Sequence, residues 1–485
     1  MPALRLPRPA ALTAVLLATT LQANSSRAQV QAPGIVSGPA LRLAGAQTFA
    51  FAPSLAGGAI RWTLDRETIS DSGTRTRTNG IESATGPAAT LSLSAVSGSE
   101  TIYYVNASDA GVQDVDTVQV FPADTRSWFT YHSPGNPDVR VYTVVPSTLN
   151  PATRILLAMH GNSRTASSYA DTWRPWAAAH DYLVLCPFYD VANWPSAGMY
   201  QMGNVFSEDD CGGTMNPRER WAFTIDLGIH QQAREGFAIA DPRFDMWGFS
   251  GGGQHVHRFM LFEPDAPVRL AISAGSGWYT VPDPVIDCPY GPGDPLQFPR
   301  QDVLDWTNRD MVIMVGTADT LRDEELRITA RADAQGLNRY QRAGYMMSKA
   351  LAFNRSTHWR RVDVPNSAHE SKPMIEGAGS VLLGQVVDTP KTPRPRIRSI
   401  VRVHPNPLAG GGRLSGEGWG GSPVQVELFD LSGRRVATHV ASASDGRWQL
   451  DWRDLVAGTR IAKGVYLVRA RDAAGEAEQK IMVLR

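Results

Sequence analysis

The sequence predicts an α/β domain with a mostly parallel sheet, flanked along the chain by two β-sandwiches. In residues 33–122 and 401–485, short runs of alternating apolar and polar residues are separated by Gly, Ser and Asp turns, which is typical of sandwiches. In residues 126–388, apolar strands alternate with longer helical stretches, which indicates a parallel sheet covered on both faces. A chain of 485 residues is long enough for about three such domains.

The composition excludes several classes of protein. Lys and Arg together number 47, as do Asp and Glu, so the formal net charge is zero, and no basic block indicates binding to nucleic acid. Hydrophobic residues make up 42 %, which is enough for globular cores. No Cys/His pair has zinc-ligand spacing, and no glycine-rich fingerprint indicates a nucleotide, so we expect no metal and no cofactor.

The first residues have the pattern of an export signal. Arg5 and Arg8 precede an apolar run over 10–21, and a polar stretch then ends at Ser26-Arg27-Ala28. We interpret residues 1–28 as a signal peptide, because the run is shorter than the roughly 20 apolar residues that a membrane span needs. A membrane anchor is the alternative. We therefore expect an exported chain with no membrane span in its mature form.

The N-terminal sandwich is expected to be of immunoglobulin type and to serve spacing or binding, since it holds no catalytic cluster. Its predicted strands are 47–51, 60–64, 89–93, 101–105 and 115–121. The predicted strands of the α/β domain are 139–145, 154–159, 182–186, 244–247, 268–273, 311–315 and 358–364, and its predicted helices are 167–180, 217–240 and 254–262. Residues 389–400 form a Pro-rich, basic linker, which is extended and semi-rigid.

One short motif carries the strongest chemical signal. Gly248-Phe249-Ser250-Gly251-Gly252 matches G-x-S-x-G, which alone is weak evidence. Its context strengthens it, because a predicted strand precedes it and a predicted helix follows, as in a nucleophile elbow. We therefore expect Ser250 to be a nucleophile. The alternative is an ordinary glycine-rich turn with an inert serine.

A serine nucleophile needs a base, and the base needs an orienting acid. His369 lies in the loop after the last predicted strand and is our choice of base, with His358 as its rival. Asp319 follows the strand 311–315 and is our choice of acid, with Asp323 as a possible substitute. The order Ser250, Asp319, His369 is one of the chain orders in which such triads occur.

Two backbone N–H groups are expected to hold the oxyanion. One is that of Gly251, at the start of the helix after the serine. The other is that of Asn162, in the turn His160-Gly161-Asn162-Ser163, where His160 is expected to shape the turn. His255 and His257 follow the elbow and either line the pocket or pack.

These motifs resemble the α/β-hydrolase superfamily, over about half of the chain. The resemblance rests on the His160-Gly161-Asn162 turn, the elbow, Gly316–Asp319 and Asn366–His369. Within the superfamily, these segments look most like the polyhydroxybutyrate-depolymerase and feruloyl-esterase-like branch. The resemblance implies hydrolysis of a carboxylic ester, in a polyester or a plant polysaccharide, through an acyl-enzyme. A serine peptidase of the same fold is an alternative, and so is a non-catalytic, polysaccharide-binding surface protein.

The C-terminal segment has a resemblance of its own. Pro405-Asn406-Pro407, Val424–Asp430, 433–436, 464–466 and the terminal strand 480–485 look like the type A sorting domain of type IX secretion. This implies that secretion machinery is a partner and that the protein is secreted or held at the cell surface. A plain carbohydrate- or partner-binding sandwich is the alternative.

Two further features leave alternatives open. Cys211 and Cys288 lie in polar loops and could pair, whereas Cys186 closes an apolar strand and is expected to be a buried thiol. Trp278 follows the strand 268–273 at the sheet end that carries the serine. It forms either a stacking wall for a substrate ring or part of the packing.

Overall fold

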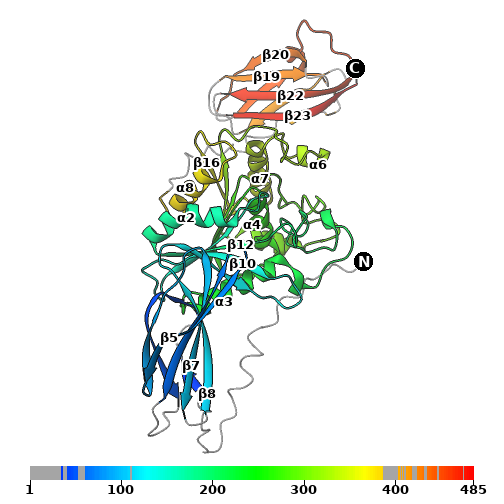
Figure 1. Ribbon diagram of the computed structural model, residues 1–485. Coiled ribbons are helices and arrows are strands. Elements are labelled where there is room, and N and C mark those ends of the chain that lie inside the picture. Colours follow the sequence, from blue (N-terminus) through cyan, green and yellow to red (C-terminus); the bar gives the residue numbers. More distant parts are fainter. Residues whose placement is uncertain are drawn as a thin grey trace, which may run out of the picture. The chain divides into compact units, whose positions relative to one another are not determined.

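The computed structural model describes residues 34–36, 41–52, 60–109, 112–385 and most of 402–484 (Figure 1). The chain divides into two compact units, Met1–Val386 and Val387–Arg485. The predicted signal peptide (1–28) and the predicted linker (389–400) lie outside the described residues. None of the helices described is long and apolar enough to cross a bilayer.

The described N-terminal strands form two sheets, ordered β1-β3-β6 and β2-β8-β7-β4-β5. Trp62, Tyr103 and Val118 lie in one buried core with alternate residues of other strands, as the two-residue period of a strand requires. Each predicted strand coincides with an observed one, although 60–64 begins one residue before β4. The strands β1, β2 and β5 were not predicted; in β5 the side chains are almost all exposed and polar. The immunoglobulin type stays a prediction. The strands are β1 (Gly34–Val36), β2 (Leu41–Leu43), β3 (Gly45–Ala52), β4 (Arg61–Ser70), β5 (Arg75–Thr85), β6 (Ala88–Leu93), β7 (Ser99–Asp109) and β8 (Val112–Phe121).

The central domain contains an eight-stranded sheet within the described residues, in the order β16-β15-β14-β13-β11-β12-β10-β9. The six strands from β16 to β12 are mutually parallel, and β10 and β9 add an antiparallel edge. The predicted α/β class is therefore confirmed for this domain. The strands are β9 (Arg126–Tyr131), β10 (Val139–Val144), β11 (Arg154–Met159), β12 (Tyr182–Phe188), β13 (Phe244–Phe249), β14 (Val268–Ala274), β15 (Met311–Gly316) and β16 (Arg360–Val364).

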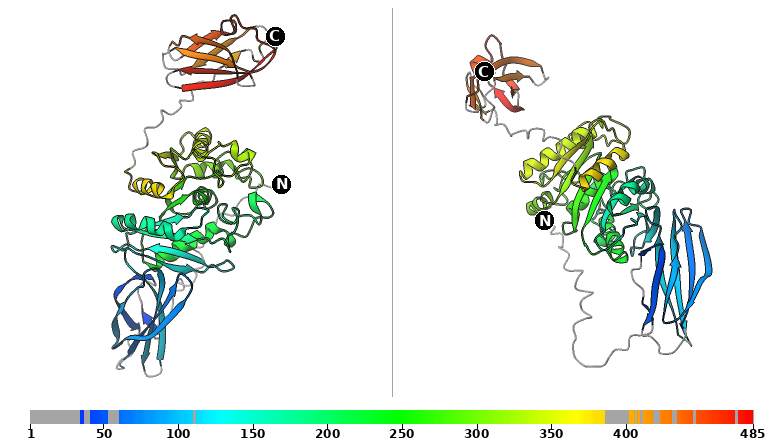
Figure 2. Two further views of the ribbon diagram at one scale, coloured as in Figure 1. Left: turned by 45° about the horizontal axis from the view of Figure 1, so that its top comes forward. Right: turned by 90° about the vertical axis from the view of Figure 1, so that its left-hand side faces the viewer.

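Helices cover both faces of this sheet (Figure 2). Along β11, Ile155 and Leu157 enter a core shared with α3, α4, α5 and α7, whereas Leu156 and Ala158 enter a second core shared with α2 and α8. Burial on both faces is the reason why the strands are almost wholly apolar. The helices are α2 (Ala166–His180), α3 (Ala222–Gly236), α4 (Gly251–Phe262), α5 (Arg300–Thr307), α6 (Ala330–Asp333), α7 (Arg339–Phe353) and α8 (Ser371–Leu382).

One predicted helix is divided. The expected helix over 217–240 is a short 3₁₀ turn, Arg218–Arg220, followed by α3, because Trp221 between them has an extended backbone. The N-terminal sheets join the central domain in one unit, since Leu41 and Phe121 pack into the same core as Phe237.

The C-terminal unit consists of two small sheets, ordered β17-β18-β21 and β20-β19-β22-β23, around a core that includes Trp448, Leu428 and Ile481. Of the segments named in the sequence, 424–430 coincides with β19, 464–466 lies in β22, and the terminal strand 480–485 overlaps β23. A short helix, α9 (Trp452–Leu455), follows β21. The strands are β17 (Arg402–His404), β18 (Arg413–Glu417), β19 (Val424–Phe429), β20 (Arg435–Ala441), β21 (Arg447–Asp451), β22 (Gly464–Asp472) and β23 (Gly475–Val483).

Candidate active site

The candidate site lies at the carboxyl edge of the parallel strands. Ser250 directly follows β13, Asp319 lies three residues after β15, and His369 lies five residues after β16. Because parallel strands end at the same edge of a sheet, residues 119 positions apart in the sequence meet there. The order of the strands in the sheet, in which β13, β14, β15 and β16 are neighbours, therefore brings these three side chains together.

Ser250 occupies a strained turn between β13 and α4. Its backbone has φ 56° and ψ −114°, in a region that residues other than glycine rarely adopt. The flanking glycines are required, since a Cβ at Gly248 would lie 2.3 Å from the carbonyl oxygen of Gly252, and one at Gly252 would lie 2.2 Å from that of Met159. The turn is therefore the strand–turn–helix of a nucleophile elbow.

His369 connects the serine to the acid. Its Nε2 lies 3.1 Å from Oγ of Ser250, and its Nδ1 lies 2.8 Å from Oδ2 of Asp319. Because a carboxylate only accepts hydrogen bonds, Nδ1 carries the hydrogen, and Nε2 is free to accept the proton of the serine. Asp319 is only 2 % exposed, and the imidazole stacks on Phe249 at 4.5 Å between ring centroids. The three predicted residues thus form one hydrogen-bonded chain.

The rival residues of the sequence prediction are engaged elsewhere. Asp323 binds the guanidinium of Arg339, and His358 contacts Asp310 on the surface. His255 is wholly buried and does not line an opening. His257 is also buried; its Nδ1 lies 3.0 Å from the carbonyl oxygen of Gly253, and its Nε2 accepts from the N–H of Thr280. The structure therefore gives both histidines a structural role in the interior.

The two predicted oxyanion donors are neighbours. A Cβ on Gly251 would lie 3.3 Å from the backbone nitrogen of Asn162, so the two backbone segments nearly touch. Gly251 is the first residue of α4, where N–H groups have no partner inside the helix and the helix dipole favours an anion. Gln201 donates from Nε2 to Oδ1 of Asn162 at 2.5 Å. The geometry can therefore place two N–H donors beside the serine.

A closed ring of hydrogen bonds lies beneath this turn. Tyr200 donates its hydroxyl to the carbonyl oxygen of His160 (2.7 Å), and Tyr189 donates its N–H to Nε2 of His160 (3.2 Å) and its hydroxyl to Asp226 (2.7 Å). Asp226 lies 2.6 Å from Nε2 of His255, whose Nδ1 lies 2.8 Å from the carbonyl oxygen of Tyr200. Burial lowers the pKa of His160 to about 3, so its imidazole is neutral. His160 therefore shapes the turn, as predicted, whereas the roles of Tyr189, Tyr200 and Asp226 were not foreseen.

Three long segments beyond the sheet edge are tied together around the site. Cys211 and Cys288 form a disulfide that joins residues 189–221 to residues 275–299, and Cys186 is a buried free thiol. Arg327, in the segment after β15, forms an ion pair with Asp210.

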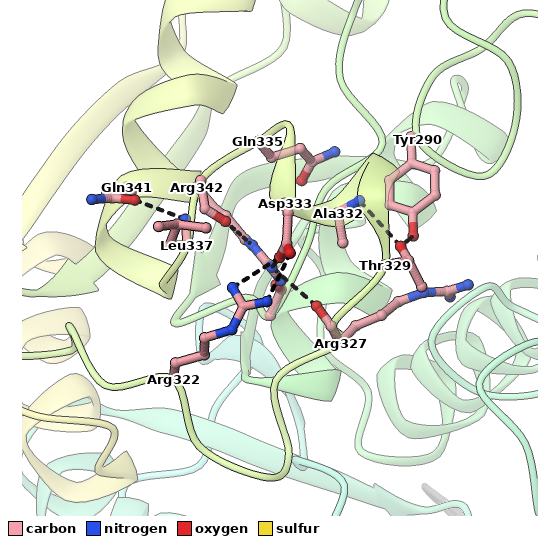
Figure 3. A network of polar contacts seen from close by, with 12 residues as sticks. Tyr290, Arg322, Arg327, Thr329, Ala332, Asp333, Gln335, Leu337, Gln341 and Arg342 are labelled. Carbon is pink, nitrogen blue, oxygen red and sulfur yellow. Dashed lines mark hydrogen bonds and ion pairs between the residues drawn. The ribbon is translucent and has the colours of Figure 1, made fainter. Parts of the chain in front are cut away.

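The segment after β15 is held by its own polar network, drawn in Figure 3. Asp333 forms ion pairs with Arg322 and with the buried Arg342, which also donates to the carbonyl oxygen of Arg327. Next to this network, the hydroxyls of Tyr290 and Thr329 lie 2.7 Å apart. These contacts fix the course of residues 322–342.

A substrate-binding Trp278 was one of our two expectations, and the structure does not place it where a substrate could stack on it. It is 3 % exposed, and the guanidinium groups of Arg258 and Arg327 lie 4.0 Å and 4.8 Å from its ring centre. The ring of Tyr290 packs against it as well. Because the indole is covered by these side chains, the structure supports the packing alternative.

The arrangement as a whole brings together the groups that acyl transfer needs: a serine hydroxyl hydrogen-bonded to an imidazole, a carboxylate bound to that imidazole, and two neighbouring backbone N–H groups. Among the described residues, no group of three or more His, Cys, Asp or Glu side chains could hold a metal ion.

Comparison with known proteins agrees with this chemistry. No family model and no curated protein matches the sequence. Among solved structures, poly(aspartic acid) hydrolase-1 from Sphingomonas sp. KT-1 is similar, with 30 % identity, a TM-score of 0.51, and coverage of 53 % of this chain and 98 % of that chain. LpqC, a poly(3-hydroxybutyrate) depolymerase from Bordetella parapertussis, has 24 % identity and a TM-score of 0.51, over 54 % of this chain and 92 % of that chain. The second likeness shows the fold alone.

Proposed function

Because the chain belongs to the α/β-hydrolase superfamily, we propose that it is a serine hydrolase that cleaves carboxylic esters, those of polymers included. The observation that carries the proposal is the hydrogen-bonded chain from Ser250 through His369 to Asp319, with distances of 3.1 Å and 2.8 Å. The strained elbow supports it, since such strain at a serine is typical of this nucleophile.

In the proposed reaction, Oγ of Ser250 attacks the ester carbonyl while Nε2 of His369 takes its proton. The N–H groups of Gly251 and Asn162 donate to the oxyanion of the tetrahedral intermediate. His369 then gives the proton to the departing alkoxide, which leaves an acyl group on the serine. Water, deprotonated by His369, repeats the sequence and releases the acid. Asp319 stabilises the imidazolium in both halves of the reaction.

A second candidate is hydrolysis of an amide polymer. It is favoured by the likeness to poly(aspartic acid) hydrolase-1, because the bonds of poly(aspartic acid) are amides. It is also the chemistry of the peptidase alternative, since ester and amide hydrolysis use the same triad.

The test compares purified wild-type protein with Ser250→Ala on p-nitrophenyl esters, on feruloylated polysaccharide, on poly(3-hydroxybutyrate) and on poly(aspartic acid). Turnover of esters that Ser250→Ala abolishes supports the esterase, and turnover of poly(aspartic acid) alone supports the amide hydrolase. A folded wild type without activity on any of them contradicts both and favours the non-catalytic, binding alternative.

We further propose that the protein is exported and that its C-terminal unit addresses it to type IX secretion. This rests on the pattern of residues 1–28 and on the sequence resemblance of 401–485. In a host with that machinery, the full chain is expected in the medium or on the cell surface. A chain that lacks 401–485 is expected to remain in the periplasm, and its release into the medium would contradict the proposal.

A further inference from the structure

Behind the proposed catalytic acid lies a buried arginine between two carboxylates. Arg339, the first residue of α7, is 1 % exposed. It donates to both oxygens of Asp323, at 2.5 Å and 2.8 Å, and its Nη1 lies 3.6 Å from Oδ1 of Asp319. One guanidinium thus faces the proposed catalytic acid and a second acid at the same time.

The two oxygens of Asp319 have different surroundings. Oδ2 accepts from Nδ1 of His369. Oδ1 is buried and has no hydrogen-bond partner among the described residues, and Arg339 is the cation that faces it. The charge on Arg339 therefore acts directly on the carboxylate that orients the base.

We propose that Arg339 and Asp323 form a charge-balancing pair: Arg339 positions Asp319, and Asp323 keeps Arg339 from neutralising it. The inference rests on the proposed function, in which Asp319 stabilises the imidazolium of His369. With both members present, the cluster of Asp319, Arg339 and Asp323 carries one net negative charge. That charge faces the imidazolium when Ser250 loses its proton.

Removing either member of the pair has a defined effect on how strongly the imidazolium of His369 is stabilised. Without Asp323, the buried guanidinium is compensated by Asp319 alone, so the cluster is neutral and stabilises the imidazolium less. Without Arg339, two carboxylates face the base, and the imidazolium is stabilised more. Hydrogen bonds from Arg339 hold the pKa of Asp323 below its ordinary value, so Asp323 is ionised at neutral pH.

Other charged and titratable groups around the cluster are accounted for. Tyr279 lies close enough to interact with Asp319, but burial raises its pKa, so it stays neutral. Arg342 interacts with Arg339 and is itself paired with Asp333. Glu370, next to His369, is exposed to solvent, where its charge is screened.

The test is the pH profile of kcat/KM on a neutral ester. In Asp323→Asn, the acid limb is expected to move to lower pH by roughly 0.5 to 1 unit, with kcat reduced about tenfold and KM unchanged. In the double variant Arg339→Met with Asp323→Asn, one charge of each sign is lost, so the limb is expected to return to within about 0.3 unit of the wild-type position. The single variant Arg339→Met would leave Asp319 and Asp323 without the cation between them, so the test relies on the double variant instead.

The matched control is Asp241→Asn, the same chemical change in an ion pair with Arg243, which lies just before β13 and therefore at the edge of the sheet opposite Asp319. Its acid limb is expected to stay where the wild type has it. An unmoved limb in Asp323→Asn, or an equal shift in the double variant, would overturn the proposal. If Ser250→Ala is inactive but the limbs do not move, this inference fails and the proposed function stands. If Ser250→Ala retains full activity, the proposed function itself fails.

Discussion

Replacing Asp319 by Asn removes one charge and changes little else. The side chain keeps its size in a site where it is 2 % exposed, and its amide can still approach Nδ1 of His369. An amide that donates to Nδ1, however, favours the tautomer with the hydrogen on Nε2. In that tautomer, the imidazole can no longer accept the proton of Ser250.

The size of the effect follows from the geometry. The charge centres of a carboxylate and an imidazolium whose facing atoms are 2.8 Å apart lie roughly 4 Å apart, which corresponds to about 4 kcal/mol at an effective dielectric constant of 20. Losing that stabilisation from the transition state lowers kcat about a thousandfold, and the wrong tautomer brings the loss to about ten thousandfold.

The assay is kcat on a p-nitrophenyl ester, with the melting temperature and the far-UV circular dichroism spectrum as controls for folding. A folded Asp319→Asn variant that loses less than tenfold in kcat would refute the assignment. The comparison with Asp323→Asn then decides between the acids, because a loss in that variant as large as the one predicted for Asp319→Asn would move the role to Asp323.

Three further predictions follow from particular contacts. Tyr200→Phe removes the hydroxyl that holds the carbonyl of His160, so we expect kcat to fall about tenfold with KM unchanged, whereas the control Tyr104→Phe in the N-terminal domain leaves kcat unchanged. Cys211→Ser opens a disulfide with a sequence separation of 77, so urea denaturation should show a loss of about 4 kcal/mol in the free energy of unfolding; a loss below 1 kcal/mol would speak against it. Burial lowers the pKa of His230 to about 4, below its unfolded value near 6.5, so stability is lost as the pH falls from about 6.5 towards 4. Between pH 7 and pH 5 this group accounts for about 2 kcal/mol, and His230→Gln should lose that much less over the same interval.

The elbow and the triad could be predicted because their signals are local. Gly248 and Gly252 flank a serine between a strand and a helix, and Asp319 and His369 each lie in a short loop after an apolar strand. Parallel strands then bring the loop ends together without any information on side-chain packing.

The supporting residues could not be predicted in the same way. Tyr200 lies in a 33-residue excursion, 189–221, that has no periodicity, and its partner His160 is 40 positions away. In the sequence, Arg339 looks like an ordinary exposed charged residue at a helix start, but tertiary packing buries it. Strand β5 was missed because a polar edge strand lacks the apolar alternation on which a prediction depends.

The most direct test of the account is active-site labelling with a fluorophosphonate, which reacts only with an activated serine. The folded wild type is expected to gain one covalent phosphonyl group, located by mass spectrometry on the peptide that contains Ser250, and Ser250→Ala is expected to gain none. Wild-type protein that stays unlabelled, or a label on another serine, would contradict the claim that Ser250, His369 and Asp319 act together.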